Sequence, residues 1–398
     1  MLKQKLSRDL LLLIVFGAFR TTSDLFMGAF FVSFIMHMSV NEILSISMYK
    51  LFEYAATCAG FFLFANWVKR YNKVAIFGFS MLPKIAVLSA IILLGDVAVE
   101  YVVPMGLLYG LSAAMYHLPR HAMTVEKTSA HSVGKFVATK NAIGYMVKIL
   151  APVVLGCFID TESYANVAVV LLLLTFVELG LVFFLTPSRH RGSSSIDFIG
   201  FYRCMMRFSV VRRMFFIEVL RGFGLGLLGT VITMYTVYMF QTNLNLGILT
   251  TVFSLCSVAM CWVLRYVHRK ATYRLILMLC ILLVLSSMIL FVSRTTPVTF
   301  LLYNFIYSTA IVALEQISNI GIYKLSQSRC ITNNTRIEYF VFRDFALFIG
   351  RWIGFTGLMY IGVFGGYAWL RWYLVLITVS IILWGGANFV LFPQKKSK

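Results

Sequence analysis

The stretch LLLLIVFGAFRTTSDLFMGAFFVSFIM, from Leu10 to Met36, decides the fold, because its only charged residues are Arg20 and Asp24. At about 1.5 Å of helical rise per residue, it is long enough to cross a hydrocarbon core of roughly 30 Å. Arg20 and Asp24 are four residues apart, so they lie on one face of the helix and can pair. Because charges are costly in lipid, this face should point into a helix bundle or a hydrated cavity. The stretch therefore predicts a membrane-spanning helix with an ion pair near its middle.

The composition of the whole chain supports this prediction. Of the 398 residues, 60% are hydrophobic and 13% are charged, and the mean hydropathy is +0.86. Soluble globular domains carry about 25% charged residues, so the chain is predicted to be an integral membrane protein. Its net charge of +20 would favour a nucleic-acid partner in a soluble protein. Here the basic residues follow the ends of apolar stretches, which argues against nucleic acid and for a membrane.

Twelve apolar stretches of spanning length follow one another along the chain. They cover residues 10–36, 43–67, 74–95, 100–123, 136–159, 164–186, 212–240, 245–266, 272–292, 297–323, 338–362 and 368–391. Basic residues crowd both termini and alternate loops, whereas the turns HMSVNE, GDVAVE, DTESY and QTNLN contain no lysine or arginine. By the positive-inside rule, both termini are predicted to be cytoplasmic in a multi-pass protein of the cell membrane.

The longest connection, 187–211, is predicted to be a cytoplasmic linker between an N-terminal bundle, 1–186, and a C-terminal bundle, 212–398. It begins with PSRHRGSSS, which is typical of a flexible polar segment. The following IDFIGFYRCMMRF mixes apolar and basic residues and favours an interfacial helix over the start of the next span.

The two bundles carry matching residues in the same order. The matches are Trp67-Val68-x-Arg70-Tyr71 with Trp262-Val263-x-Arg265-Tyr266, Leu107-Leu108-Tyr109 with Leu301-Leu302-Tyr303, Arg20 and Gly28 with Arg221 and Gly229, and Lys140 and Lys148 with Arg343 and Arg351. An internal repeat of six-span halves around a midplane site is the architecture of many secondary transporters. The predicted fold class is therefore all-α, with twelve transmembrane helices in two pseudo-symmetric six-helix bundles.

The sequence resembles the major facilitator superfamily (MFS) across nearly its whole length, in its topology, its long central loop and the basic turn after the second span. In that family the turn usually has the pattern G-x-x-x-D-R-x-G-R-R, whereas this chain has Ala65, Lys69 and Asn72 where Gly, Asp and Gly are usual. Lys69 thus stands where the aspartate of the usual gating ion pair is found. The run Glu338-Tyr339-x-x-x-Arg343-Asp344 with Gly350-Arg351 is similar to small bacterial members. The resemblance implies the MFS fold and transport by alternating access.

Ionisable residues inside the spans are the candidates for function, because lipid cannot solvate a charge. Three pairs lie three or four residues apart and can neutralise each other: Arg20 with Asp24, Lys50 with Glu53, and Glu218 with Arg221. A structural and a functional role both stay open for these pairs. A carboxylate that gains a proton as a cavity closes would couple transport to protons. The proton-coupling candidates are Asp24, Glu53 and Glu315, and a shared network of Asp24 and Glu53 with Arg20 is one possibility.

Cations at matching positions of both bundles favour an anionic substrate group such as a carboxylate or a phosphate. Lys140, Lys148 and Arg351 have no acidic neighbour within one helical turn. Lys140 and Arg343 are close enough to the ends of their spans to snorkel to the surface instead. The substrate-binding candidates are Arg20, Lys148, Arg221, Arg351, Tyr109 and Tyr303, although packing is the alternative role for the two tyrosines.

The gating candidates are Lys69, Arg70, His117, Arg120, Arg343 and Asp344. His117 and His121 could hold a metal, but no third ligand is evident, HExxH is absent, and no metal or cofactor is predicted. Pro119 between them favours a bend in a cytoplasmic gate. The seven cysteines are odd in number and scattered without a CxxC pair, so the pattern supports neither a disulfide framework nor a zinc site and favours core packing. An enzyme such as an acyltransferase would need an acid or an asparagine at the same depth as the histidines. None is evident in the sequence, so no enzyme is predicted.

The predicted function is secondary active transport of a small anionic or zwitterionic organic substrate by alternating access, with proton coupling. Export is favoured over uptake on the family resemblance alone. One alternative is a flippase for a lipid or a lipid-linked sugar on the same fold. Another is a transport-dead membrane scaffold, suggested by the altered turn after the second span. The expected partners are a small-molecule or lipid substrate and the membrane lipids around a monomer.

Overall fold

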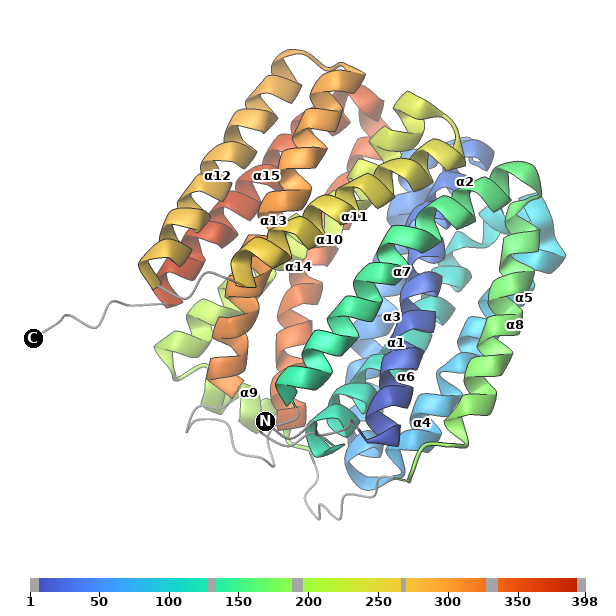
Figure 1. Ribbon diagram of the computed structural model, residues 1–398, viewed down its shortest axis with the longest axis vertical. Helices are drawn as coiled ribbons and strands as arrows, with labels where there is room; N and C mark the ends of the chain where they lie inside the picture. The colour runs from blue at the N-terminus through green and yellow to red at the C-terminus, as the bar shows by residue number, and fades with distance from the viewer. Residues whose placement is uncertain (1–6, 128–132, 188–195, 266–269, 327–335, 392–398) are drawn as a thin grey trace, which may run out of the picture. The chain divides into compact units, whose positions relative to one another are not determined.

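The computed structural model describes residues 7–127, 133–187, 196–265, 270–326 and 336–391, and these form helices and short connections without a strand (Figure 1). Eleven of the described helical stretches are long and apolar enough to cross a membrane. One of them, Lys73–Thr124, has 52 residues. At about 78 Å of helical rise it exceeds twice the hydrocarbon core, so it supplies two of the twelve predicted crossings. The all-α polytopic fold predicted from the sequence is confirmed.

The first part of the chain forms ten helical elements (Figure 1). They are α1 (Arg8–Leu25), η1 (Phe26–Phe30), α2 (Phe31–Met38), α3 (Glu42–Arg70), α4 (Lys73–Phe79), α5 (Met81–Leu94), η2 (Gly95–Tyr101), α6 (Val102–Lys127), α7 (Val133–Thr161) and α8 (Tyr164–Val182). The chain leaves α5 at Gly95, whose φ of 53° is open to glycine at little steric cost. This turn separates the two crossings of the 52-residue stretch.

The described residues of the second part, within 196–265, 270–326 and 336–391, form seven helices. They are α9 (Phe198–Met205), α10 (Ser209–Phe240), α11 (Asn243–Arg265), α12 (Lys270–Ser293), α13 (Pro297–Ser326), α14 (Arg336–Phe364) and α15 (Gly366–Leu391). The short helix α9 forms where the sequence predicted an interfacial helix. Its Phe201 and Met205 are buried against Met214 of α10 and Phe342 of α14.

The chain groups into two compact units. The first comprises Met1–Ile196 and Thr236–Thr251, and the second comprises Asp197–Tyr235 and Val252–Lys398. The end of α10 and the start of α11 therefore belong to the first unit, although they follow the central linker in sequence. The predicted bundles, 1–186 and 212–398, stay a prediction. The structure adds that the segment Thr236–Thr251 groups with the first unit.

Close packing of α3 against α6 positions much of the first unit. A Cβ atom at Gly106 would lie 3.2 Å from the backbone nitrogen of Glu53, and one at Gly110 would lie 3.0 Å from the Cβ of Ala56. Small residues allow such an approach between helices in lipid, where association depends on packing. The same helix α6 carries Tyr109 and Ser112, which bond to Asp24 and Arg20 of α1.

Candidate functional site

Arg20 lies at the centre of a polar network that joins α1 to α6. Its Nε lies 2.9 Å from Asp24 Oδ1, and its Nη1 donates to Ser112 Oγ at 3.1 Å. The hydroxyl of Tyr109 donates to the same Asp24 oxygen at 2.6 Å. The side chain of Arg20 is 4% exposed, whereas that of Asp24 is 43% exposed. The network therefore presents a carboxylate on one side and buries the guanidinium that neutralises it.

The backbone changes geometry directly after Asp24. The π-helical turn η1 interrupts the α-helix at Phe26–Phe30, and Tyr49 of α3 donates to the carbonyl oxygen of Met27 at 3.4 Å. Single π-turns inside α-helices occur frequently at functional sites. Glu53, on the same helix as Tyr49, pairs with Lys50 at 2.8 Å. In the described part of the chain, Glu53 and Arg20 thus belong to separate pairs rather than to one shared network.

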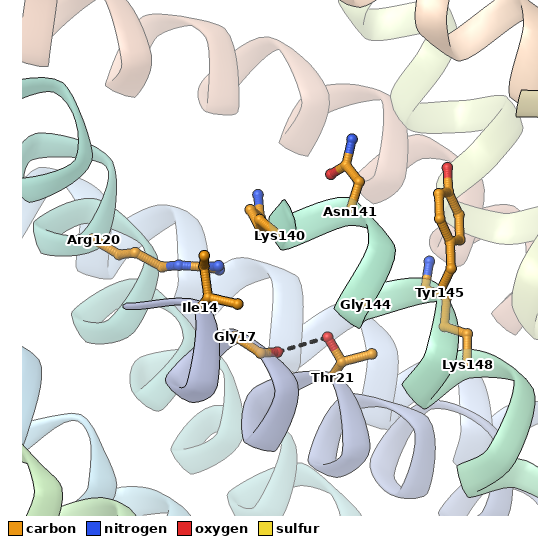
Figure 2. Close-up of a pocket in the computed structure, with 9 residues that line it drawn as sticks. All are labelled: Ile14, Gly17, Thr21, Arg120, Lys140, Asn141, Gly144, Tyr145 and Lys148. Atoms are coloured by element: carbon orange, nitrogen blue, oxygen red, sulfur yellow. Dashed lines mark hydrogen bonds between the residues drawn. The ribbon is translucent and has the colours of Figure 1, made fainter. Parts of the chain in front are cut away.

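A pocket of about 240 Å³ lies between α1, α6 and α7, all within the first unit (Figure 2). Its lining residues are Ile14, Gly17, Thr21, Arg120, Lys140, Asn141, Gly144, Tyr145 and Lys148. Three of these side chains are cations and none is a carboxylate. Among the described residues, Arg120, Lys140 and Lys148 make no ion pair. The pocket is therefore a concentration of positive charge that the described part of the chain does not neutralise.

Helix spacing and one glycine shape this pocket. The α7 residues Lys140, Gly144 and Lys148 lie four apart and share a face. Figure 2 shows Lys140, Asn141 and Tyr145 projecting from the same side of α7. A Cβ atom at Gly17 of α1 would lie 2.6 Å from Arg120 Nη2, so Gly17 leaves the space that the guanidinium uses. That Nη2 atom is buried and has no hydrogen-bond partner in the described part of the chain.

The ring of Tyr116 links the pocket to the Arg20 network. The guanidinium carbon of Arg20 lies 5.3 Å from the centroid of this ring, and that of Arg120 lies 5.4 Å from it. Both distances are in the range of cation–π contacts. The cation of the network and one cation of the pocket therefore contact the same side chain.

The second unit uses its buried charges differently. Glu218 of α10, whose side chain is fully buried, lies 3.6 Å from Arg221 Nη1 and accepts a hydrogen bond from Arg343 Nε of α14 at 3.2 Å. Arg221 also pairs with Glu315 of α13 at 3.1 Å. The i,i+3 pairing of Glu218 with Arg221 was predicted from spacing. The structure adds that Arg343 and Glu315 join the same network.

The other predicted site residues lie in varied surroundings. Tyr303 is fully buried and shares a hydrogen bond of 3.1 Å with Thr378 Oγ1. Lys69 is buried near the end of α3, whereas Arg70 is exposed. The ring of His117 lies 5.1 Å from that of Tyr116 and 6.4 Å from that of His121. Arg351 and Asp344 are half-buried on α14.

The structure contains a buried ion pair that the sequence analysis missed. Lys84 of α5 and Glu178 of α8 lie 2.8 Å apart, and their side chains are 4% and 2% exposed. Both are charged residues inside predicted spans, so the argument applied to Arg20 would have identified them. Among the described residues there is no group of three histidine, cysteine or acidic side chains placed to hold a metal ion.

A cluster of hydrogen bonds closes one end of the first unit. Both carboxylate oxygens of Asp160, at the end of α7, accept from the start of α11: Asn243 N at 3.2 Å, Asn243 Nδ2 at 2.9 Å and Leu244 N at 2.8 Å. Ser33 and Tyr164 each donate to Asn243 Oδ1 at 2.8 Å. This Asn243 cluster (Ser33, Asp160, Tyr164, Asn243 and Leu244) joins α2, α7, α8 and α11, at the end where the turns lack basic residues.

Comparison with solved structures identifies the fold. A bacterial homologue of the iron transporter ferroportin, in an inward-facing state, matches 98% of this chain and 99% of its own, with a TM-score of 0.65 and 12% identity. The human organic anion transporter MFSD10 matches 96% of this chain and 98% of its own, with a TM-score of 0.62 and 12% identity. A bacterial metal transporter matches 98% and 99%, with a TM-score of 0.59 and 14% identity.

At these identities the similarity concerns the fold alone. No protein-family model and no curated protein sequence matches the chain. The helices, their membrane-spanning lengths and the near-complete coverage of these transporters agree with the resemblance seen in the sequence. The chain has the polytopic all-α fold of the major facilitator superfamily transporters.

Proposed function

We propose that the chain is a secondary active transporter of the cell membrane that moves a small anionic or zwitterionic organic substrate by alternating access. The observation that carries this proposal is the pocket that contains Arg120, Lys140 and Lys148 without a carboxylate. Like charges in one partly buried pocket repel one another, and an anionic ligand offsets that repulsion. The same positive charge would repel a divalent metal ion. We therefore favour an organic anion over the metals named for two of the compared transporters.

The proposed coupling site is Asp24, which is the exposed carboxylate of the Arg20 network. When Asp24 is protonated, Arg20 loses its counter-charge while it still contacts the ring that Arg120 contacts. The positive potential around the pocket then rises, so an anion binds more tightly. Proton and anion therefore favour each other's binding, as reciprocal linkage requires. Because the coupling between proton binding and anion binding is favourable, it supports co-transport of proton and anion in the same direction.

The Asn243 cluster supports alternating access. It ties the segment Thr236–Thr251 to the first unit, while the rest of α10 and α11 belongs to the second. A movement of the second unit must therefore bend both helices near these boundaries or break the cluster. Such a two-state closure at one end is what transport from alternate sides of a membrane needs. We propose that both termini face the cytoplasm.

Purified protein in proteoliposomes tests the proposal by measuring uptake of labelled organic anions under an imposed pH gradient. Co-transport predicts anion accumulation on the alkaline side, and loss of the gradient dependence in Asp24→Asn. The control, Glu162→Gln, changes an exposed carboxylate of the first unit that accepts from Asn166 Nδ2 at 3.2 Å, and it should keep the dependence. Accumulation on the acidic side would instead support the exchange mechanism that proton-driven export requires. Equal flux with the gradient collapsed would remove proton coupling.

A further inference from the structure

We propose that the pocket formed by Arg120, Lys140 and Lys148 binds a phosphate monoester group in its dianionic form. This inference rests on the proposed function and names the class of anion that the pocket accepts. The alternatives are monoanions such as a carboxylate or a sulfate ester. Charge distinguishes the phosphate from both monoanions, donor geometry distinguishes it from a carboxylate, and size limits the chain that it carries.

The count of charges favours a dianion. The pocket contains three cations and no carboxylate, and Arg20, which shares the ring of Tyr116 with Arg120, is already neutralised by Asp24. One negative charge would leave two of the three cations uncompensated beside each other. A phosphate monoester carries about −1.5 to −2 charges at pH 7 and therefore offsets most of the positive charge.

The hydrogen-bond donors of the pocket fit a tetrahedral ester with three terminal oxygens better than a carboxylate with two, whereas charge alone separates a phosphate from a sulfate ester. Arg120 contributes a planar fork that binds two oxygens, and the two lysines act as point charges. The buried Nη2 of Arg120 is a donor without an acceptor in the described part of the chain. Gly144 lies midway between Lys140 and Lys148, and a Cβ atom there would meet nothing within 4 Å. The space between the two ammonium groups is thus open to a ligand.

The size of the pocket limits what enters with the phosphate. A volume of about 240 Å³ is below the roughly 300–1,000 Å³ of sites for drug-sized ligands. The pocket therefore holds a head group with at most a short chain. Two sources share this chemistry: a small soluble phosphate ester, and the head group of a phosphomonoester lipid whose acyl chains stay outside.

Butyl phosphate and butyl sulfate separate the charge classes, because both are tetrahedral esters and differ in charge at neutral pH. The experiment is equilibrium binding to the full chain in phosphatidylcholine nanodiscs. At pH 7.5 we expect butyl phosphate to bind at least about tenfold more tightly than butyl sulfate. At pH 5.5 the phosphate loses most of its second charge, so the difference should largely disappear. Butyl sulfate keeps its charge and reports any titration of the protein itself.

Matched variants connect the preference to the pocket. Lys148→Gln and Lys140→Gln each remove one pocket cation, so each should reduce the phosphate preference at pH 7.5 by at least about threefold. Arg294→Gln removes a cation from an exposed position in the second unit and should leave the preference unchanged. The control has the same change of net charge and distinguishes a pocket effect from a general one.

Competition with lipids identifies the source of the phosphate. If phosphatidic acid in the nanodisc displaces butyl phosphate and phosphatidylglycerol does not, the pocket binds a lipid head group. If neither lipid displaces it, the ligand is a soluble ester; both results support the proposal.

Equal or tighter binding of butyl sulfate or butyrate, reduced by Lys148→Gln, would overturn the phosphate class and leave the proposed anion transporter unaffected. If none of the three anions binds in a pocket-dependent way, both proposals fail.

Discussion

One pair of matching positions differs between the two units: Arg343 of the second unit pairs with Glu218, whereas Lys140 of the first unit makes no ion pair among the described residues. Arg221 and Arg343 of the second unit share Glu218, and Arg221 also pairs with Glu315. In the first unit, Arg20 pairs with Asp24, but the pocket of Arg120, Lys140 and Lys148 contains no carboxylate. Under the proposed function, one copy of the predicted repeat uses a cation in an internal ion pair, and the other presents the matching cation to the anion.

The largest expected effect is on the stability of the second unit. In Glu218→Gln, the buried Arg221 and Arg343 lose a shared counter-charge, and we expect the free energy of unfolding to fall by about 3–5 kcal/mol. Chemical unfolding in detergent measures this loss. Glu315→Gln is the matched control: this carboxylate is 41% exposed, so its removal should cost under about 1 kcal/mol. Equal losses in the two variants would contradict the assignment of Glu218 as the centre of the network.

The first unit should respond in the opposite way. Arg120→Gln removes a cation that has no acidic partner among the described residues, so stability should stay within about 0.5 kcal/mol of the native value. Anion uptake in proteoliposomes should fall at least about tenfold, because the pocket loses its guanidinium. A protein destabilised as strongly as Glu218→Gln would show that Arg120 has a structural partner, and the contrast between the units would disappear.

A smaller effect is expected at the segment that the first unit takes from the second half of the sequence. Asp160→Asn removes the charge that accepts three hydrogen bonds at the start of α11, at a cost of about 1–2 kcal/mol. Hydrogen exchange should become faster at Asn243 and Leu244. Asp96→Asn, in an exposed turn, should leave this exchange unchanged. Unchanged protection in Asp160→Asn would mean that the carboxylate does not hold the closure.

The smallest effect tests how Arg120 reaches the pocket. A methyl group at Gly17 would displace the flexible end of Arg120, so Gly17→Ala should weaken anion binding by about threefold with little loss of stability. Gly28→Ala is the control on the same span, since a Cβ atom there meets nothing within 4 Å. Binding titrations compare the two variants. Identical affinities would show that Gly17 does not set the position of the guanidinium.

Much of the fold could be predicted from the sequence, because span length and loop charge follow directly from the physics of the bilayer. The pairs Arg20–Asp24, Lys50–Glu53 and Glu218–Arg221 could also be predicted, since helical spacing alone brings their side chains together. The pocket could not be predicted from the sequence. It depends on the packing of α6 and α7 against α1, and the periodicity of a sequence does not reveal which helices contact each other. Lys148 was expected to bind substrate, whereas Arg120 was expected only in a gate.

Other features depend on tertiary contacts that the sequence does not encode locally. Lys84 and Glu178 are 94 positions apart, and only the packing of α5 against α8 makes them a pair. The contact of one ring, that of Tyr116, with two guanidinium groups follows from the side-chain directions of Arg20 and Arg120. The segment Thr236–Thr251 joins the first unit through Asp160, which lies in a different half of the sequence.

Anomalous diffraction from crystals soaked in selenate tests most directly whether the anion site lies in the first unit. Selenate is a tetrahedral dianion with a strong anomalous signal, so it locates an anion site without assumptions about the substrate. The account predicts a peak within hydrogen-bond distance of Arg120 and of at least one of Lys140 and Lys148, and loss of that peak in Lys148→Gln crystals. A principal peak beside Arg221 or Arg351, with the pocket empty, would contradict it.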